Sequence, residues 1–149
     1  MLALPYYHQE TDFSCGSTCV QMVLEYFGIK KSEEALRQRM NARPRIGTSH
    51  ASLTQTLRAH QIGCRSRTKA TLQDIERALA ADHPVIINFI DPATSEGHYA
   101  VVTDMQQESI ITHDPWNGPG TMYDCVGFSD RWHNSTGRSQ QWMLEVWKV

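Results

Sequence analysis

One cysteine stands where a thiol can become a nucleophile, at the start of a predicted helix. Cys15 follows the segment 9–14, and an apolar run at helical spacing from Cys19 to Phe27 ends at Gly28. This pattern predicts a helix whose first turn holds Cys15 and Gly16. Unpaired backbone N–H groups and the positive end of the helix dipole favour a thiolate there. We therefore expect Cys15 to attack electrophilic carbon.

A cysteine nucleophile needs a base, and the base needs a partner that orients it. His98 begins one predicted strand, and Asp114 ends the next. In an antiparallel hairpin the numbers of opposed residues have a fixed sum, and the midpoint of these two positions falls at residue 106, beside the predicted turn at 106–108. The two side chains should lie nearly opposite each other, within about one register step. Asp114 would then fix the tautomer of His98 and stabilise its protonated form.

Other histidines are alternative bases. His113 neighbours Asp114, but strand alternation points its side chain to the opposite face. The remaining five are interpreted as surface or satisfied core residues: His8, His50, His60, His83 and His133. His98 is therefore the predicted base.

Gln9 precedes Cys15 by six residues. Alone it would be interpreted as a polar loop residue, but at this spacing its side-chain NH₂ and the backbone N–H of Cys15 are candidates for an oxyanion hole. Trp116 and a turn-rich loop at 117–120 are candidates for the border of the site.

Capping signals predict the helices that support these residues. Ser32 and Ser49 are expected to cap helices, the first reaching about residue 40 and the second closed by Gly63. Thr71 and Asp74 form a predicted capping box, and the helix that it opens ends before Pro84.

Apolar patterns predict the strands. The run 85–90 is typical of a central strand buried on both faces, and further strands are expected over 98–105, 109–114 and 141–148. Helices first and antiparallel strands afterwards predict an α+β fold class.

Length, charge and composition limit the number of domains and the kinds of partner that this chain can have. The 149 residues are expected to form one domain, 1–149, with enough chain for a core. A net charge of −2 without a long basic run argues against a nucleic-acid partner. No segment approaches the roughly 20 apolar residues of a membrane span.

The cysteines lie at 15, 19, 64 and 125. No signal peptide supports secretion and disulfides, so a reducing, cytoplasmic location is expected. Cys19, one turn after Cys15, should face inward, and Cys64 and Cys125 are expected to be small buried hydrophobes. A zinc site on Cys15 and Cys19 is the alternative, although zinc ligands usually come in tighter pairs.

Taken together, these motifs resemble the C39 family of papain-like cysteine peptidases and its stand-alone relatives. The resemblance extends from Pro5 to about Trp132, and Ser17 departs from it where alanine is more usual. The motifs that carry it are Gln9, Cys15-Gly16, the strand His98-Tyr99-Ala100-Val101-Val102, Asp114-Pro115, Tyr26-Phe27-Gly28 and Pro84-Val85-Ile86.

The resemblance implies a papain-like fold, with N-terminal helices packed on a C-terminal antiparallel sheet, and a thiol-dependent peptidase that needs no metal or organic cofactor. Cys15 would attack the scissile carbonyl, and His98 would protonate the leaving amine and then activate water. Asp114 would orient His98, and Gln9 would help to hold the oxyanion.

The substrate stays open. Family members often form the N-terminus of ATP-driven exporters and cut leader peptides after a double glycine, but this chain has no Walker motif, so that role would need a separate transporter or larger assembly as partner. An isopeptide linkage or a cell-wall peptide are other candidates. Two alternatives also stay open: an acyltransferase or isopeptidase on the same fold, and a catalytically idle module that binds peptides.

Overall fold

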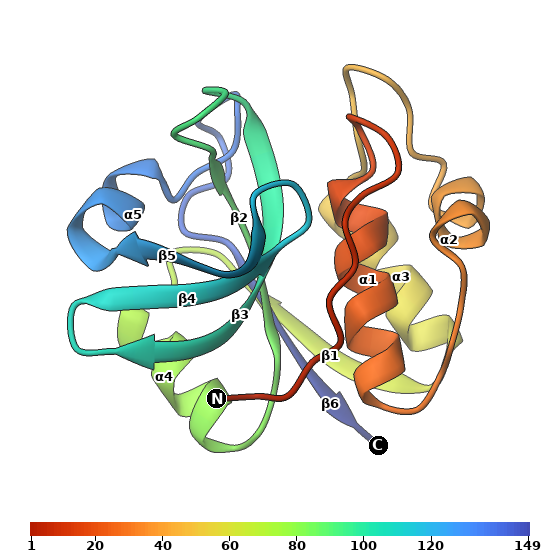
Figure 1. Ribbon diagram of the computed structural model, residues 1–149, viewed down its shortest axis with the longest axis horizontal. Coiled ribbons are helices and arrows are strands. Elements are labelled where there is room, and N and C mark those ends of the chain that lie inside the picture. Colours follow the sequence, from red (N-terminus) through yellow and green to blue (C-terminus); the bar gives the residue numbers. More distant parts are fainter.

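Six strands form one antiparallel sheet in the computed structural model, which describes residues 1–149 (Figure 1). In the order in which they lie side by side, the strands are β1 (Ile62–Arg67), β6 (Met143–Lys148), β2 (Val85–Ile90), β3 (Gly97–Gln106), β4 (Ser109–Asp114) and β5 (Gly118–Asp124).

Helices cover both faces of this sheet (Figure 1). Those on one face are α1 (Cys15–Tyr26), α2 (Glu33–Arg39) and α3 (His50–Ala59), and those on the other are α4 (Leu72–Ala80) and α5 (Cys125–Arg131). Each face has its own apolar core. Strand β2 serves both, because Ile86 packs with α1 while Val85 and Ile87 pack with α4 and α5. The prediction of a central strand buried on both faces is confirmed.

The predicted helix starts are confirmed. The Ser32 hydroxyl accepts the Ala35 N–H, and the Ser49 hydroxyl accepts the Ser52 N–H. Both hydrogen bonds of the Thr71 capping box form, since Thr71 and Asp74 each accept the other's backbone N–H. Helix α1 ends at Tyr26, and Gly28 follows in the left-handed region with a φ of 89°.

Gly63 does not close the third helix, contrary to the prediction. The chain leaves α3 through Gln61, whose φ is 60°, and Gly63 lies inside β1 opposite Trp147. A Cβ atom at Gly63 would lie 2.3 Å from the Trp147 indole nitrogen. Glycine is therefore required here by the close approach of a ring and not by a helix end, and a strand was missed as a result.

The loop expected at 117–120 is largely a strand, which is a second correction. β5 begins at Gly118 and occupies the edge of the sheet, where Pro119 does not interrupt a central ladder. Helix α5 follows, and the Asp124 carboxylate caps it by accepting the Gly127 N–H. Neither element was predicted. The α+β class is nevertheless confirmed.

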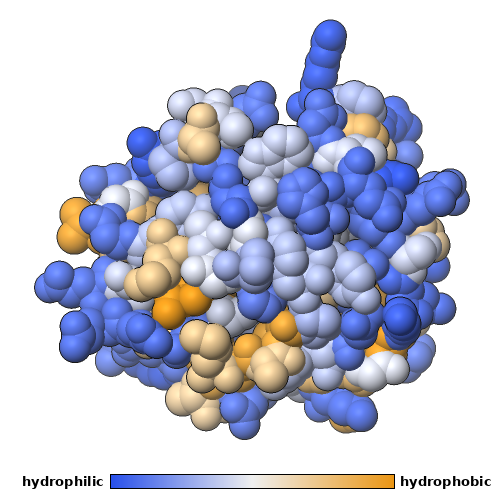
Figure 2. Space-filling view, in the orientation of Figure 1, coloured by the Kyte–Doolittle hydropathy of each residue, from blue (hydrophilic) through white to orange (hydrophobic).

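Most of the surface in the view of Figure 2 is hydrophilic, with apolar residues gathered toward the lower edge. None of the five helices combines the length and apolar character that crossing a bilayer requires.

Candidate active site

Cys15 is the first residue of α1, as predicted, and its side chain is partly exposed. The preceding Ser14 does not cap the helix, because its hydroxyl bonds instead to the N–H and carbonyl of Thr11 at 3.1 and 3.2 Å. No acidic residue lies in the first turn either. No side chain of the first turn therefore neutralises the positive end of the helix at the thiol.

Gly16 brings α1 close to the sheet. A Cβ atom at this position would lie 3.2 Å from the Thr48 side chain and 3.3 Å from the ring of Tyr99 in β3. The absence of a side chain at Gly16 thus sets how near the helix carrying Cys15 approaches the strand carrying His98.

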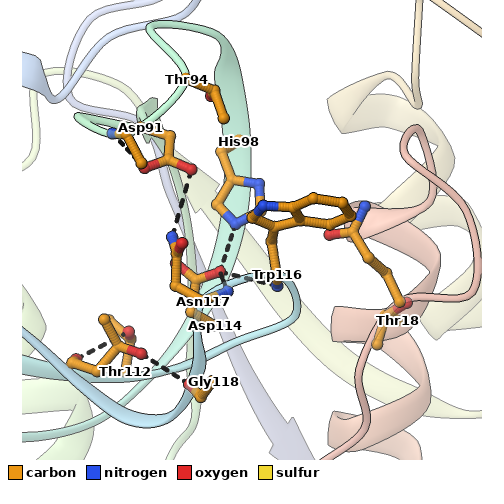
Figure 3. Close-up of polar contacts among 12 residues, drawn as sticks. Thr18, Asp91, Thr94, His98, Thr112, Asp114, Trp116, Asn117 and Gly118 are labelled. Atoms are coloured by element: carbon orange, nitrogen blue, oxygen red, sulfur yellow. Dashed lines mark hydrogen bonds and ion pairs between the residues drawn. The ribbon is translucent and has the colours of Figure 1, made fainter.

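The structure brings His98 and Asp114 together, with His98 Nε2 2.6 Å from Asp114 Oδ1 (Figure 3). The register is less direct than expected. Val101 pairs with His113, so the position opposite Asp114 is Ala100, two residues beyond His98. A bulge between Val102 and Asp104 shifts the pairing, and the imidazole reaches the carboxylate diagonally across the hairpin.

Asp114 is fully buried, and both of its carboxylate oxygens are saturated with donors. Besides His98, Oδ1 accepts the backbone N–H groups of Trp116 and Asn117, each at 3.0 Å. Oδ2 accepts the Tyr123 hydroxyl at 2.7 Å and the Asn117 side-chain amide at 3.2 Å. The carboxylate is therefore fixed in one orientation.

This environment sets the charges of the pair. Burial alone would lower the pKa of His98, but the hydrogen bond to Asp114, followed by the hydrogen bond and charge of Cys15, raises it to about 10. Burial would raise the pKa of Asp114, yet the bond and charge of His98 and the bonds from Tyr123 and Asn117 lower it to about 2. At neutral pH the pair is therefore an imidazolium and a carboxylate, the form that a neighbouring thiolate stabilises.

Gln9 is 5% exposed and lines the same cavity as Cys15 and His98. Its backbone N–H donates to the carbonyl of Pro115 at 2.9 Å, beside Asp114. Its side-chain nitrogen donates one hydrogen to the Thr11 carbonyl at 2.7 Å, which fixes the orientation of the amide and leaves the second hydrogen without a partner. Its Oε1 has no hydrogen-bond partner.

Two cavities meet at Cys15. The smaller, of about 80 Å³, is lined by Gln9, His98, Asp91 and Trp116 in addition to Cys15. Trp116 is 45% exposed and forms part of the wall of this cavity. It therefore lies at the border of the site, as predicted. Asn117 of the predicted border loop also reaches the site, through Asp114.

The larger cavity, of about 770 Å³, extends from Cys15 along the segment 44–50 and strands β2 and β3. His50, predicted to be a surface or satisfied core residue, lies in its wall. The His50 ring stacks on Trp142 at 4.0 Å, and its Nδ1 lies 2.6 Å from the Tyr99 hydroxyl. Burial lowers the pKa of His50, so its ring is neutral. His50 is thus a fixed, satisfied part of the wall.

Several residues of the site were not predicted. Asp91 directly follows β2, is 2% exposed, and accepts the Asn117 side-chain amide at 3.3 Å, which links it to Asp114 (Figure 3). The sequence contained a pattern that could have indicated Asp91, because Asp91-Pro92 repeats the Asp114-Pro115 dipeptide at the end of an apolar run. Tyr123 gave no such signal, since the strand that carries it was missed.

The other candidates lie elsewhere. His113 faces away from Asp114, with Nε2 3.0 Å from the Leu4 carbonyl oxygen. Cys19 and Cys64 are buried, as expected, but Cys125 is half-buried because it begins α5. All four cysteines are free thiols. No group of three or more histidine, cysteine or acidic side chains is arranged to hold a metal ion.

Comparisons with known proteins identify the family and the fold. The model of the Peptidase C39 like family matches residues 1–140. No curated protein matches the chain.

Solved structures share the fold over nearly the whole chain. The peptidase domain of Streptococcus ComA, a bifunctional ABC transporter of a quorum-sensing pathway, superposes with a TM-score of 0.78 at 21% identity, with 100% of each chain covered. A putative C39-like peptidase from Bacillus anthracis gives 0.79 at 17% identity, covering 100% of this chain and 96% of that one. A double-glycine motif protease of an AMS/PCAT transporter, solved with its leader peptide, gives 0.76 at 15%, covering 99% and 94%. The predicted papain-like fold is confirmed.

Proposed function

Because the chain belongs to the Peptidase C39 like family, we propose that it is a cysteine peptidase that hydrolyses amide bonds with Cys15, His98, Asp114 and Gln9. The observation that carries this proposal is the 2.6 Å bond between His98 and the buried Asp114, at a cavity that Cys15 also lines. A partly exposed thiol, an oriented imidazole and a fixed carboxylate are the parts that nucleophilic acyl transfer needs.

In the first half of the reaction, the Cys15 thiolate attacks the scissile carbonyl carbon. The negative charge that develops on the carbonyl oxygen is held by the backbone N–H of Cys15 and by the unpartnered hydrogen of the Gln9 amide. As the tetrahedral intermediate collapses, the C–N bond breaks and His98 gives its proton to the leaving nitrogen. The products of this half are a thioester on Cys15 and a free amine.

In the second half, neutral His98 takes a proton from water, which attacks the thioester carbonyl. The C–S bond breaks, the acid product leaves, and the thiolate and imidazolium are restored. Asp114 stays ionised throughout, and the four hydrogen bonds that it accepts from Trp116, Asn117 and Tyr123 keep its Oδ1 directed at His98 Nε2. A reducing compartment such as the cytoplasm keeps Cys15 a free thiol.

For the substrate, we propose a leader peptide that a separate transporter or larger assembly presents. The support comes from the solved neighbours, which include the peptidase domain of an ABC transporter and a protease bound to a leader peptide. The large cavity beside Cys15 has room for an extended peptide segment.

Selective alkylation tests the proposal directly. Iodoacetamide at pH 7, with the modified residue located by mass spectrometry, should label Cys15 far faster than Cys125, which is also partly accessible. The same protein should cleave a peptide library in a Cys15-dependent way. Equal labelling of the two thiols, or a library left intact by the wild-type protein, would instead identify a catalytically idle peptide-binding module.

A further inference from the structure

The leaving-group side of the site is acidic. Three carboxylate residues, Asp12, Asp91 and Glu96, line the smaller cavity with Cys15 and His98, and no lysine or arginine lines it. The larger cavity differs, because Arg45 stands in its wall. Asp12 and Glu96 line both cavities and Asp91 lines only the smaller one, so the smaller cavity carries negative charge with no lysine or arginine to balance it.

Two of these carboxylates have no counter-charge. Asp12 lies three residues before Cys15, and Glu96 lies two residues before His98. Both are exposed, both line the two cavities where they meet at Cys15, and neither side chain forms a hydrogen bond or a salt bridge within the chain. Both carboxylates are therefore free to pair with a cation that a ligand brings to the place where the two cavities meet.

A second observation also indicates a ligand on this side. Gln9 is 5% exposed and lines the same cavity, and its Oε1 accepts no hydrogen bond. The orientation of this amide is fixed by its donation to Thr11, so the acceptor is not a misassigned nitrogen. A buried acceptor without a donor is costly, and a donor supplied by the substrate would satisfy it.

The chemistry assigns this cavity to the part of the substrate that leaves first. His98 must lie within hydrogen-bond reach of the nitrogen that it protonates, and His98 lines the smaller cavity and not the larger. Asp91 and Trp116 therefore contact the segment that follows the scissile bond. The exposed indole of Trp116 adds a ring face to which cations are attracted.

We infer that the enzyme selects substrates with a lysine or arginine in the first two residues after the scissile bond, recognised by Asp12, Asp91 and Glu96 beside Trp116. This inference rests on the proposed function for the direction of the chain, and it names the substrate class of that site. The cation approaches from solvent, so part of the selectivity is electrostatic steering and falls as salt screens the carboxylates.

Charged thiol reagents test the acidic cavity without requiring peptide cleavage. We would measure the rates at which a cationic trimethylammonium-ethyl and an anionic sulfonato-ethyl methanethiosulfonate modify Cys15. In the double variant Asp12→Asn/Glu96→Gln the cation-to-anion rate ratio should fall about tenfold. Glu76→Gln, which removes an exposed charge from α4, is the matched control and should leave the ratio within about twofold.

Peptides test the same idea in turnover. Three substrates with Gly-Gly on the acyl side would differ only in the second residue after the scissile bond, which would be lysine, acetyl-lysine or glutamate. We expect kcat/KM for lysine to exceed that for acetyl-lysine about fivefold and that for glutamate about tenfold or more at 0.05 M salt, and the differences to shrink at 0.5 M. Glu96→Lys should reverse the order.

The two proposals can fail separately. Cleavage of all three peptides at rates within twofold, or an unchanged reagent ratio in the double variant, would overturn the cationic-substrate inference and leave the peptidase intact. A shifted reagent ratio with no Cys15-dependent cleavage of any peptide would support the acidic cavity and contradict the proposed function.

Discussion

The Tyr6 hydroxyl donates a 2.7 Å hydrogen bond to the main-chain carbonyl oxygen of Asp114, 108 positions later in the chain. Three residues on, the Gln9 N–H bonds to the carbonyl of Pro115. The N-terminal segment is thus hydrogen-bonded to the backbone of Asp114 and Pro115 before α1 begins. The positions of Gln9 and Cys15 therefore depend on the same loop that holds Asp114.

The first prediction separates the two cysteines of α1. Cys15→Ala and Cys15→Ser should abolish turnover and change the free energy of unfolding by no more than about 1 kcal/mol, because the partly exposed thiol packs little. Cys19→Ala should do the reverse, since Cys19 is 0% exposed and its loss leaves a cavity that costs about 1 kcal/mol or more. Peptide cleavage and urea unfolding measure both. Turnover that survives in Cys15→Ala contradicts the assignment.

The second prediction concerns Asp114. Asp114→Asn keeps the shape but removes the charge that stabilises the His98 imidazolium, so kcat should fall about tenfold or more. His113→Ala is the matched neighbour, and its effect on kcat should be much smaller because its ring bonds to Leu4 on the other face. Steady-state kinetics of the two variants decide the matter. A larger loss for His113 would mean that the strand-face assignment, and with it the choice of His98 as the base, is wrong.

The third prediction tests Gln9. An oxyanion donor acts on charge that exists only in the transition state, so Gln9→Ala should lower kcat/KM on the order of 10²-fold while iodoacetamide labels Cys15 at an unchanged rate. Gln9→Glu should be at least as harmful, because it brings negative charge to the oxyanion. Stopped-flow acylation with an activated ester, run beside labelling, measures both. If both rates drop together, Gln9 supports the Cys15 loop and holds no oxyanion.

The fourth prediction is a stability profile with two flanks. His98 titrates at about 6.5 when unfolded and about 10 when folded, so the stability that it contributes is complete below about pH 6.5 and is lost as pH rises toward 10. Asp114 titrates at about 3.9 unfolded and about 2 folded, so its contribution is complete above about pH 4 and is lost as pH falls toward 2. Melting temperatures across this range should fall on both sides in the wild type.

The variants His98→Ala and Asp114→Asn provide the control for that profile. Each partner shifts the pKa of the other, so both flanks should flatten in both variants. In His98→Ala part of the acid flank should remain, because the bonds from Tyr123 and Asn117 still lower the pKa of Asp114. Unchanged flanks in both variants would assign the pH dependence to other groups and remove the ion pair as its cause.

The parts of the site that sequence predicted are those fixed by local pattern. The hairpin of β3 and β4 closes over a short turn, where Gln107 takes a φ of 50°, so His98 and Asp114 are brought together by their distance from that turn. The nucleophile helix and its glycine stop are equally local. Neither required knowledge of a distant contact.

The parts that were missed depend on pairing between distant segments. Gly63 carries the same signal whether it ends a helix or lies under a ring, and only the approach of Trp147 from β6 decides between them. Tyr123 bonds to Asp114 because β5 pairs with β4 as an edge strand, in a stretch whose glycines and proline indicate a loop. The periodicity of the sequence therefore could not predict that Tyr123 holds Asp114 in place.

The close packing at Gly16 links the reactivity of Cys15 to the position of helix α1 on the sheet. The thiol belongs to the helical half and the imidazole to the sheet half, and the two halves meet where Gly16 lies against Thr48 and Tyr99. Neither half alone contains both Cys15 and His98. Reactivity at Cys15 therefore reports how closely the two halves pack. A side chain at position 16 would press against Thr48 and Tyr99 and move the thiol relative to the imidazole without unfolding a helix or strand.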